Sequence, residues 1–392
     1  MSKSLLPGAT LGVMGGGQLG RMFVQAAQSM GYFTAVLDPD PTSPAGMVAH
    51  YHIDTDYLDE QGLAQLMQRC DGITIEFENV PSPALVTLGA HRPTSPDADA
   101  LGVCQDRALE KAHFKRCGVA CAPHAVIANE AQLAAVPAAL FPAILKTSRM
   151  GYDGKGQVGV ADLAALPAAW AALGGAACVL EQRLPLAHEI SVVIARSAMG
   201  VVVGLPVQQN LHRDGILAVT EVPAPDVPEA TRQQAFEAAA RVADSLNYVG
   251  VLCVEFFVLD DGRLVANEMA PRPHNSGHHS IDSCDVSQFE LQVRALTGLP
   301  LVAPRQHSAA VMLNLLGDLW FARGDVPRAP DWAAVLALPG VHLHLYGKTG
   351  ARRGRKMGHL TVTADQPAQA RDVARQAAAL LGIDPGLVGS AA

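Results

Sequence analysis

Residues 251–272 read VLCVEFFVLDDGRLVANEMAPR, and this stretch gives the strongest structural signal in the chain. Strand-like residues lie on both sides of Asp261-Gly262, which is a preferred two-residue hairpin turn. Counting outward from a two-residue turn places Glu255 directly opposite Glu268. Two carboxylates that face each other across a hairpin repel and destabilise it. The stretch therefore predicts a β-hairpin whose central pair needs a positive partner.

A divalent cation between the two carboxylates would remove this repulsion. Asn267, next to Glu268, supplies a further oxygen. A site made of oxygens suits Mg²⁺, which proteins usually hold with one or two carboxylates together with substrate phosphates. We therefore expect Glu255 and Glu268 to bind magnesium. The alternative is a solvated, charged hairpin whose register has slipped.

A glycine-rich run upstream is typical of a phosphate-binding loop. Lys146 ends an expected strand and is followed by residues 149–157, RMGYDGKGQ. The glycines let backbone N–H groups fold over phosphates, and the flanking lysines add positive charge. The Gly-Lys-Ser/Thr ending of a Walker loop is absent. A flexible hairpin loop is the alternative.

Two further segments fit the rest of a nucleotide. Residues 181–184, EQRL, end one expected strand, and Glu189 begins the next. A strand edge with an acid nearby can hydrogen-bond an adenine and then a ribose, although a surface turn would look the same. Taken in order along the chain, the lysine, the glycine-rich loop, the strand edge and the paired glutamates predict one site for a nucleoside triphosphate and its metal.

The N-terminal residues carry a different nucleotide motif. Gly15-x-Gly17-x-x-Gly20 lies between an expected strand and an expected helix, and Asp38 ends the next strand. This spacing matches the dinucleotide fingerprint, in which the pyrophosphate lies at the helix N-terminus and the acid holds the ribose. The alternative is a tight turn that binds nothing, or that binds another anion. We favour this alternative over a nicotinamide enzyme, because the rest of the chain supplies its own nucleotide site.

Hydrogen-bond donors and cations gather in two further places. Residues 272–278, RPHNSGH, directly follow the paired glutamates, where an acceptor substrate would meet the γ-phosphate. Lys348 and residues 352–356, RRGRK, place five cations within nine residues. In a chain of net charge −8 such a cluster suggests an anion pocket, most simply for a substrate phosphate. A solvated basic loop is the alternative.

The order of the expected elements predicts the fold class. At 392 residues the chain is too long for one ordinary core. Residues 1–105 alternate strands and helices, which predicts an α/β domain with an open parallel sheet. Residues 106–301 hold short, valine-rich strands that look antiparallel, an α+β pattern. Residues 302–392 form a third, smaller block.

Composition narrows the class of protein. Hydrophobic residues make up 49% of the chain and charged residues 17%, as in globular proteins. The net charge of −8 argues against a nucleic-acid partner. No histidine or second cysteine pair completes a zinc site with Cys117 and Cys121. Without a signal sequence or a bilayer-spanning stretch, we expect a soluble, cytoplasmic protein with reduced thiols and no membrane partner.

Together these motifs resemble those of the 5-(carboxyamino)imidazole ribonucleotide synthase family of ATP-grasp ligases. They span nearly the whole chain in the family's order, and as a set they are highly specific, although the glycine turn alone is not. The matching segments are GGGQLGRM (15–22), QDR (105–107), EK (110–111), GYDGKGQ (151–157), NEMAPRPHNSGH (267–278), SQFE (287–290), YGK (346–348) and GRKMGH (354–359).

The resemblance implies a fold and a set of site residues. The fold is an ATP-grasp fold, with a Rossmann-like pre-ATP-grasp domain (1–105), an ATP-grasp domain of two lobes (106–301) and a small C-terminal domain (302–392). Magnesium would be held by Glu255 and Glu268. The residues implied to hold ATP are Arg107, Lys146, Gly151, Tyr152, Asp153, Gly154, Lys155, Gly156, Gln157, Glu181, Gln182, Arg183, Leu184, Glu189, His212, Asn267 and Glu268.

The resemblance also implies a reaction. ATP would phosphorylate bicarbonate to carboxyphosphate, and the exocyclic amine of 5-aminoimidazole ribonucleotide would then take up the carboxyl group, with Asp153 orienting or deprotonating that amine. A homodimer is the family expectation. The residues implied to contact the ribonucleotide are Gln18, Glu76, Tyr152, Asp153, Arg272, His274, Asn275, Lys348 and Arg355, of which Asp153, Arg272, His274 and Asn275 are the expected catalytic residues.

Other classes share parts of this pattern. Formate- or glycine-using purine enzymes and biotin carboxylase have a related ATP site, and a non-catalytic ATP-binding regulator is a further class, against which the intact Glu255/Glu268 pair argues. The chain departs from the family at His279 and Ser280, where an aromatic residue and a threonine are usual, and at Arg353, where proline is common. These departures concern local shape rather than the expected chemistry.

Overall fold

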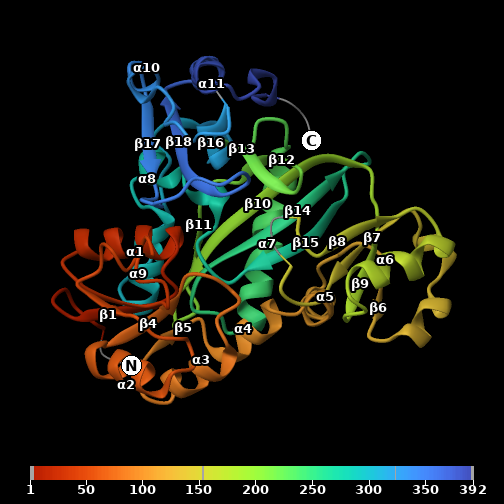
Figure 1. Cartoon of the computed structure of the whole chain (residues 1–392), viewed down its shortest axis with the longest axis horizontal. Coiled ribbons are helices and arrows are strands. Elements are labelled where there is room, and N and C mark those ends of the chain that lie inside the picture. Colours follow the sequence, from red (N-terminus) through yellow and green to blue (C-terminus); the bar gives the residue numbers. More distant parts are fainter. Residues whose placement is uncertain (1–3, 152–153, 323, 390–392) are drawn as a thin grey trace.

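The computed structural model describes residues 4–151, 154–322 and 324–389, which form three β-sheets with helices on their faces (Figure 1). Within these residues no helix is long and apolar enough to cross a membrane. All seven cysteines carry free thiols.

The N-terminal sheet is parallel, as predicted, with the strand order β3-β2-β1-β4-β5. Buried aliphatic residues on both faces drive its formation, because each face is covered by helices. The glycine turn of residues 15–20 lies between a strand and a helix, as predicted. The strands are β1 (Thr10–Met14), β2 (Phe33–Leu37), β3 (Tyr51–Ile53), β4 (Gly72–Ile75) and β5 (Thr94–Ser95), and the helices are α1 (Gln18–Ser29), α2 (Glu60–Arg69), α3 (Ser82–Gly89) and α4 (Ala98–Cys104).

A small antiparallel sheet forms the lobe drawn in yellow in Figure 1. Its order is β6-β9-β7-β8, so β9 lies inside the sheet, between β6 and β7. The sequence predicts that residues 181–184 end a strand, and β9 ends at Gln182. The strands are β6 (His124–Ile127), β7 (Ala143–Thr147), β8 (Gln157–Val160) and β9 (Cys178–Gln182), and α6 (Leu166–Ala172) packs on this lobe.

The largest sheet has nine strands and runs through the centre of the molecule. The strands of the C-terminal block do not form a sheet of their own, because β16 pairs with β13 and so extends the central sheet. Its strands are β10 (Leu186–Arg196), β11 (Val202–Gly204), β12 (Gln208–Arg213), β13 (Ile216–Val222), β14 (Gly250–Leu259), β15 (Leu264–Ala270), β16 (Ala309–Leu316), β17 (Val341–Leu345) and β18 (Lys356–Ala364).

Helices fix this central sheet to its neighbours. α7 (Glu229–Ser245) packs on β10 and β14 through alanine and valine side chains. α9 (Gln288–Thr297) packs against α1, so the N-terminal sheet shares a core with the segment that follows β15 (Figure 1). The remaining helices are α5 (Arg107–Arg116), α8 (Ser280–Ser283), α10 (Trp332–Leu336) and α11 (Pro367–Leu381).

The turn of the β14–β15 hairpin differs from the prediction. The Leu259 N–H donates to the Arg263 carbonyl over 2.9 Å, so residues 260–262 form a three-residue loop. Gly262 closes it in the left-handed region, with φ of 82°. A loop of this length commonly combines a tight turn with a left-handed glycine. The expected two-residue turn is therefore wrong.

A β-bulge restores the predicted pairing. The longer loop places Val258 opposite Leu264, one residue out of the expected register. The register shifts again between Glu255 and Phe256, where Asn267 is the extra residue of β15. Beyond the bulge Glu255 lies opposite Glu268, as predicted. Two deviations from a regular hairpin therefore cancel.

Candidate active site

The paired glutamates lie at the centre of the site. The bulge places the Asn267 amide oxygen 3.4 Å from the Lys146 ammonium, while Glu268 Oε2 lies 2.7 Å from Arg107 Nη1. In a regular strand these consecutive side chains would point to opposite faces. The bulge therefore lets Asn267 and Glu268 serve the same site.

Neighbouring groups keep both carboxylates ionised. Burial alone would raise the pKa of Glu268, but the charges of Arg107 and then Lys146 outweigh it and lower that pKa below its ordinary value. Burial likewise opposes ionisation of Glu255, and His274 overcomes it and lowers the pKa. Two ionised carboxylates beside an amide oxygen are the donor set that suits Mg²⁺.

A buried lysine that the site prediction omitted joins the two lobes. Lys111 Nζ lies 3.1 Å from Glu181 Oε2 on β9 and donates to the Asn267 carbonyl on β15 over 2.8 Å. Glu181 also pairs with Lys146 Nζ at 3.2 Å. Lys111 follows Arg107 by one helical turn on α5, and this spacing is the sequence signal that could have identified it.

The glycine-rich loop connects β7 and β8, whose ends pair Lys146 with Gln157. Gly154 and Gly156 adopt positive φ values of 75° and 71°. A Cβ on Gly154 would lie 3.0 Å from the Asp214 carbonyl, so the loop packs against the turn between β12 and β13. Tyr152 and Asp153, predicted site residues of this loop, lie outside the described residues.

The expected adenine segment, residues 181–184, spans the end of β9 at Gln182. The N–H groups of Gln182 and Arg183 already donate to the carbonyls of Pro123 and Pro142, over 2.9 Å each. Leu184 comes directly after them and is half-buried. The segment thus differs from an open strand edge, since the N–H groups of Gln182 and Arg183 are used inside the protein.

The expected ribose acid pairs with a histidine of the next strand. Glu189 lies on β10 and forms an ion pair with His212 on β12. Burial would lower the pKa of His212, but Glu189 and then Glu255 raise it to about 9. The ion pair between β10 and β12 therefore favours the charged form of His212.

The acceptor loop follows β15 and faces the glutamate pair. His274 Nε2 lies 2.9 Å from Glu255 Oε1. Arg272 forms an ion pair with Glu78, which the prediction omitted. Glu78 lies just after β4, at the carboxyl edge of the parallel sheet where ligands of such sheets bind, and this position is the signal that could have found it.

Asn275 is the residue of this loop whose surroundings best fit contact with a substrate. Its side chain is only 8% exposed. Neither its amide nitrogen nor its amide oxygen has a hydrogen-bond partner among the described residues. A buried, unsatisfied amide is costly in a folded protein. Asn275 therefore fits a residue that completes its hydrogen bonds with substrate.

The glycine turn after β1 holds a carboxylate of the protein itself. Glu76 accepts hydrogen bonds from the N–H groups of Gly17 (2.7 Å) and Gly20 (3.0 Å) at the start of α1. Asp38 accepts from the Gly16 N–H over 2.6 Å. These two acids fill the places that a dinucleotide pyrophosphate and ribose would need. This internal filling argues against the nicotinamide interpretation.

Glu76 also bears on the predicted substrate pocket. Burial raises the pKa of Glu76, the two backbone N–H groups oppose that change, and Asp38 adds to it. Both carboxylate oxygens of Glu76 are already bonded to the helix N-terminus. The side chain therefore positions the start of α1, including Gln18, whatever contact it makes with substrate.

The predicted phosphate site joins the two ends of the chain. Lys348 Nζ donates to Gln18 Oε1 over 2.9 Å, although the two residues are 330 positions apart. Arg355 Nη1 donates to the Gly350 carbonyl over 2.6 Å. Arg353 instead stacks over the Phe321 ring at 5.2 Å. The five cations of the cluster therefore do not all point into one pocket.

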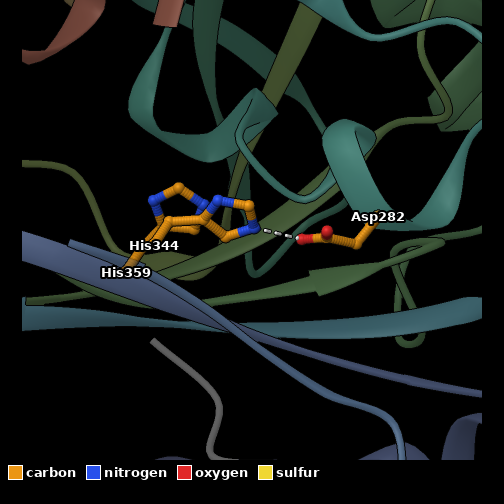
Figure 2. A group of neighbouring side chains, drawn as sticks. All are labelled: Asp282, His344 and His359. Atoms are coloured by element: carbon orange, nitrogen blue, oxygen red, sulfur yellow. Dashed lines mark hydrogen bonds and ion pairs between the residues drawn. The ribbon is translucent and has the colours of Figure 1, made fainter. Parts of the chain in front are cut away.

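A second group of possible metal ligands lies where α8 meets β17 and β18. His344 Nε2 lies 2.8 Å from Asp282 Oδ2, and His359 stacks on His344 (Figure 2). The two ring planes differ by only 11° and their centroids are 4.5 Å apart. Imidazole binds metals through lone pairs in the ring plane, so parallel stacked rings do not converge on one ion. The cluster therefore fits a packed junction better than a metal site.

Known proteins match this chain along most of its length. Residues 8–105 match the ribonucleotide synthetase preATP-grasp domain, residues 112–289 the ATP-grasp domain, and residues 310–373 the phosphoribosylaminoimidazole carboxylase C-terminal domain. The N5-carboxyaminoimidazole ribonucleotide synthase of Brucella melitensis is 45% identical over 361 residues, which cover 91% of this chain and 97% of that protein. The chain belongs to the N5-carboxyaminoimidazole ribonucleotide synthase family.

Other members of this family agree in sequence and in fold. The synthase of Bacillus subtilis is 40% identical, over 92% of this chain and 93% of its own. A crystal structure of an N5-carboxyaminoimidazole ribonucleotide synthetase with ADP superposes with a TM-score of 0.88 at 38% identity, covering 96% of this chain and 98% of that one. The Aspergillus clavatus synthase, solved with ADP and 5-aminoimidazole ribonucleotide, gives 0.87 at 30% identity, covering 96% of this chain and all of that one. The predicted ATP-grasp fold is confirmed, and the chain is an ATP-dependent ligase of this family.

Proposed function

We propose that the chain carboxylates 5-aminoimidazole ribonucleotide with bicarbonate and ATP, giving N5-carboxyaminoimidazole ribonucleotide, ADP and phosphate in purine biosynthesis. Relatives that match over nine-tenths of the chain carry this activity in their names. The observation that carries the proposal is the placing of Glu255 and Glu268. The two glutamates lie between Lys146, on the proposed nucleotide side, and the acceptor loop that carries Arg272, His274 and Asn275.

The nucleotide side would hold ATP through charge. Lys146 and Arg107 flank the glutamate pair, and the glycine-rich loop connects β7 to β8. In our proposal the adenine, ribose and phosphates are bound by Glu181, Gln182, Arg183, Leu184, Glu189, His212 and Asn267. Glu255 and Glu268 would hold Mg²⁺, which when bound neutralises charge on the transferring phosphoryl group.

Phosphoryl transfer to bicarbonate would convert a poor electrophile into carboxyphosphate. Negative charge spreads over the phosphoryl oxygens during transfer, and in our proposal the Lys146 ammonium and the Arg272 guanidinium stabilise it. The arginine is held by Glu78, which fixes its direction. Carboxyphosphate hydrolyses readily, so the site must exclude water, and the glycine-rich loop is the proposed cover.

The ribonucleotide would span from the acceptor loop to the C-terminal loops. The Asn275 amide, which lacks a partner within the described residues, would form hydrogen bonds with the base of the ribonucleotide, beside Arg272 and His274. Lys348 and Arg355 would bind the phosphate, near Gln18 and the Glu76-bound helix start. We propose that Tyr152 and Asp153 contact the base from the glycine-rich loop, with Asp153 orienting the amine.

Two wider properties belong to the same proposal. The enzyme would act in the cytoplasm, where its nucleotide substrates are made, and the seven free thiols agree with a reducing compartment. A homodimer is proposed from the family expectation, and sedimentation equilibrium would test it directly.

Oxygen labelling tests the proposed intermediate. With ¹⁸O-labelled bicarbonate, transfer of the γ-phosphoryl group to a bicarbonate oxygen leaves one labelled oxygen in the phosphate after the amine attacks carbon. We expect one ¹⁸O in each phosphate formed, in step with carboxylated product. Unlabelled phosphate with full product formation would exclude carboxyphosphate as the route.

A further inference from the structure

A buried chain of hydrogen bonds leads from the central sheet to His274. It begins at Thr220 on β13 and passes through Asn210 on β12 and Ser191 on β10 to Ser276, which lies two residues after the histidine. The successive distances are 2.9 Å, 2.7 Å and 2.7 Å, and Ser276 Oγ lies 2.9 Å from His274 Nδ1. The four supporting side chains are at most 4% exposed, so water does not compete with these bonds.

The hydrogen bonds all run in one direction, from Asn210 toward His274, because the groups differ in whether they can donate or accept. Asn210 Nδ2 can only donate, so Ser191 Oγ accepts from it and spends its single hydrogen on Ser276. Ser276 Oγ accepts that bond and has one hydrogen of its own. The buried Cys253 thiol also neighbours Ser276, but thiol sulfur is a weak acceptor. The hydrogen therefore goes to His274 Nδ1.

A second contact fixes the same direction independently of how the Asn210 amide is oriented. The backbone N–H of Ser276 points to His274 Nδ1 over 3.3 Å. If the chain ran the other way, Nδ1 would carry a hydrogen that faced this N–H. Both contacts therefore require a lone pair on Nδ1, and the proton of the neutral ring must be on Nε2, which lies 2.9 Å from Glu255 Oε1.

We propose that Asn210, Ser191 and Ser276 are positioning residues that hold His274 as the Nε2–H tautomer, so that the ring donates a hydrogen bond to Glu255. The hydrogen bonds of these three side chains connect them to one another and to His274. They act through His274, which they orient from the side opposite the glutamate pair. The catalytic value of this arrangement rests on the proposed function, whereas the tautomer itself does not.

The arrangement would fix the direction of one carboxylate of the proposed magnesium pair. A histidine that donates to Glu255 occupies one carboxylate oxygen with a hydrogen bond and so fixes the plane of the carboxylate. The opposite tautomer would bring a nitrogen lone pair against the same oxygen and push the two groups apart. Residues that hydrogen-bond to the ligands of a metal, without binding the metal themselves, typically contribute about 10- to 100-fold to activity or metal affinity.

The substitution Asn210→Asp should reverse the direction of these hydrogen bonds with little change in the shape of the side chain. A carboxylate at this position can only accept, so Ser191 would donate to it, Ser276 would donate to Ser191, and Nδ1 would have to donate to Ser276. The ¹⁵N shifts of the ring nitrogens separate the two tautomers directly. We would record them on ¹⁵N-histidine-labelled full-length protein without substrates. The His274 signals are assigned by their loss in His274→Gln.

We expect the Nε2–H tautomer in the wild type and the Nδ1–H tautomer in Asn210→Asp, with kcat reduced about 10- to 100-fold and KM for ATP little changed. Asn314→Asp is the matched control, because Asn314 is buried in β16 of the same sheet but outside the chain, and it should keep Nε2–H. If Asn210→Asp does not fold, Ser276→Ala removes the hydroxyl donor and should give a mixture of tautomers.

Two results would overturn the proposal. One is an Nδ1–H tautomer in the wild type, and the other is an Nε2–H tautomer that persists in both Asn210→Asp and Ser276→Ala. The spectra are taken without substrates, so the tautomer assignment can fail while carboxylation is observed. Conversely, an inactive wild type with the expected spectra would count against the proposed function alone.

Discussion

Glu268 gains its proposed role from its immediate neighbours rather than from its own chemistry. Arg107 and Lys146 overcome the effect of burial and keep its carboxyl ionised, and Glu255 faces it across the hairpin. Glu268→Gln keeps the size of the side chain but removes the charge that would bind magnesium. We expect kcat to fall at least about 100-fold. Steady-state ADP release measures this loss.

The control for this change is Glu290→Gln on α9, where Glu290 pairs with Arg294 away from the glutamate pair. It should leave both kcat and Tm close to the wild type. Wild-type activity in Glu268→Gln, with a normal circular dichroism spectrum, would remove Glu268 from the proposed metal site.

The Glu110 carboxyl should make the free energy of unfolding depend on pH. It is buried on α5 and accepts from the Met269 N–H over 2.6 Å, and burial raises its pKa to about 8 although Lys111 and Arg107 oppose this. Its unfolded value is about 4.3. Between these values the folded state binds one more proton than the unfolded state, so this group makes stability fall as pH rises.

Glu110→Gln removes that linkage and can keep the bond from Met269. Its Tm, compared with the wild type, should therefore improve steadily as pH is raised from about 5 to about 8. Thermal unfolding of both proteins across this range measures the difference. A Tm difference that is independent of pH would mean that Glu110 is not protonated in the folded protein.

At the scale of elements, two Asp-Gly pairs show how much local sequence can predict. Asp214-Gly215 joins β12 to β13 as a two-residue turn with both φ values positive, yet this hairpin was not expected. Asp261-Gly262 was expected to form such a turn, but it ends a three-residue loop. The dipeptide marks a reversal, whereas the loop length depends on how the flanking strands pair.

The three-residue loop makes its own prediction. Gly262 has φ of 82°, and a Cβ there would meet no atom within 4 Å, so Gly262→Ala should cost only the strain of the backbone, about 1 kcal/mol. Gly102→Ala is the matched control, because Gly102 lies in α4 with equally open surroundings. In a helix this change should stabilise by about 0.5–1 kcal/mol.

Urea unfolding of the two variants gives both values. Opposite signs are expected, since only Gly262 occupies the left-handed region. A neutral Gly262→Ala would show that the loop can adopt another conformation and that the register near the turn is not fixed by this glycine.

The parts of the site that sequence could not predict are those built from distant segments. The glutamate pairing was predictable because hairpin residues are close in the chain. The Glu76 contact with the start of α1 depends on β4 lying beside β1, and Lys348 meets Gln18 across 330 positions. No local pattern specifies such contacts. Resemblance supplied Gln18, Glu76 and Lys348 as candidates, and the structure shows how each is held.

At the scale of the whole molecule, α9 joins the acceptor loop to the N-terminal sheet. Leu296 of α9 is 6% exposed in a core shared with Phe23 and Met22 of α1. Leu296→Ala should reduce the free energy of unfolding by about 2–5 kcal/mol. Because α9 follows the loop of His274 and Asn275, we also expect KM for the ribonucleotide to rise more than KM for ATP.

Leu336→Ala is the control for this change, because Leu336 is half-exposed at the end of α10. It should alter neither stability nor KM by a measurable amount. Equal rises in both KM values in Leu296→Ala would indicate a general loosening of the fold instead of a specific link between α9 and the ribonucleotide pocket.

The central claim is that one site couples ATP cleavage to carboxylation of the ribonucleotide. The most direct test is ADP release from MgATP and bicarbonate, measured with and without 5-aminoimidazole ribonucleotide. We predict strong stimulation by the ribonucleotide, with one phosphate released for each carboxylated product. ADP release that the ribonucleotide does not change, in protein that still binds ATP, would contradict the account and direct attention to another acceptor.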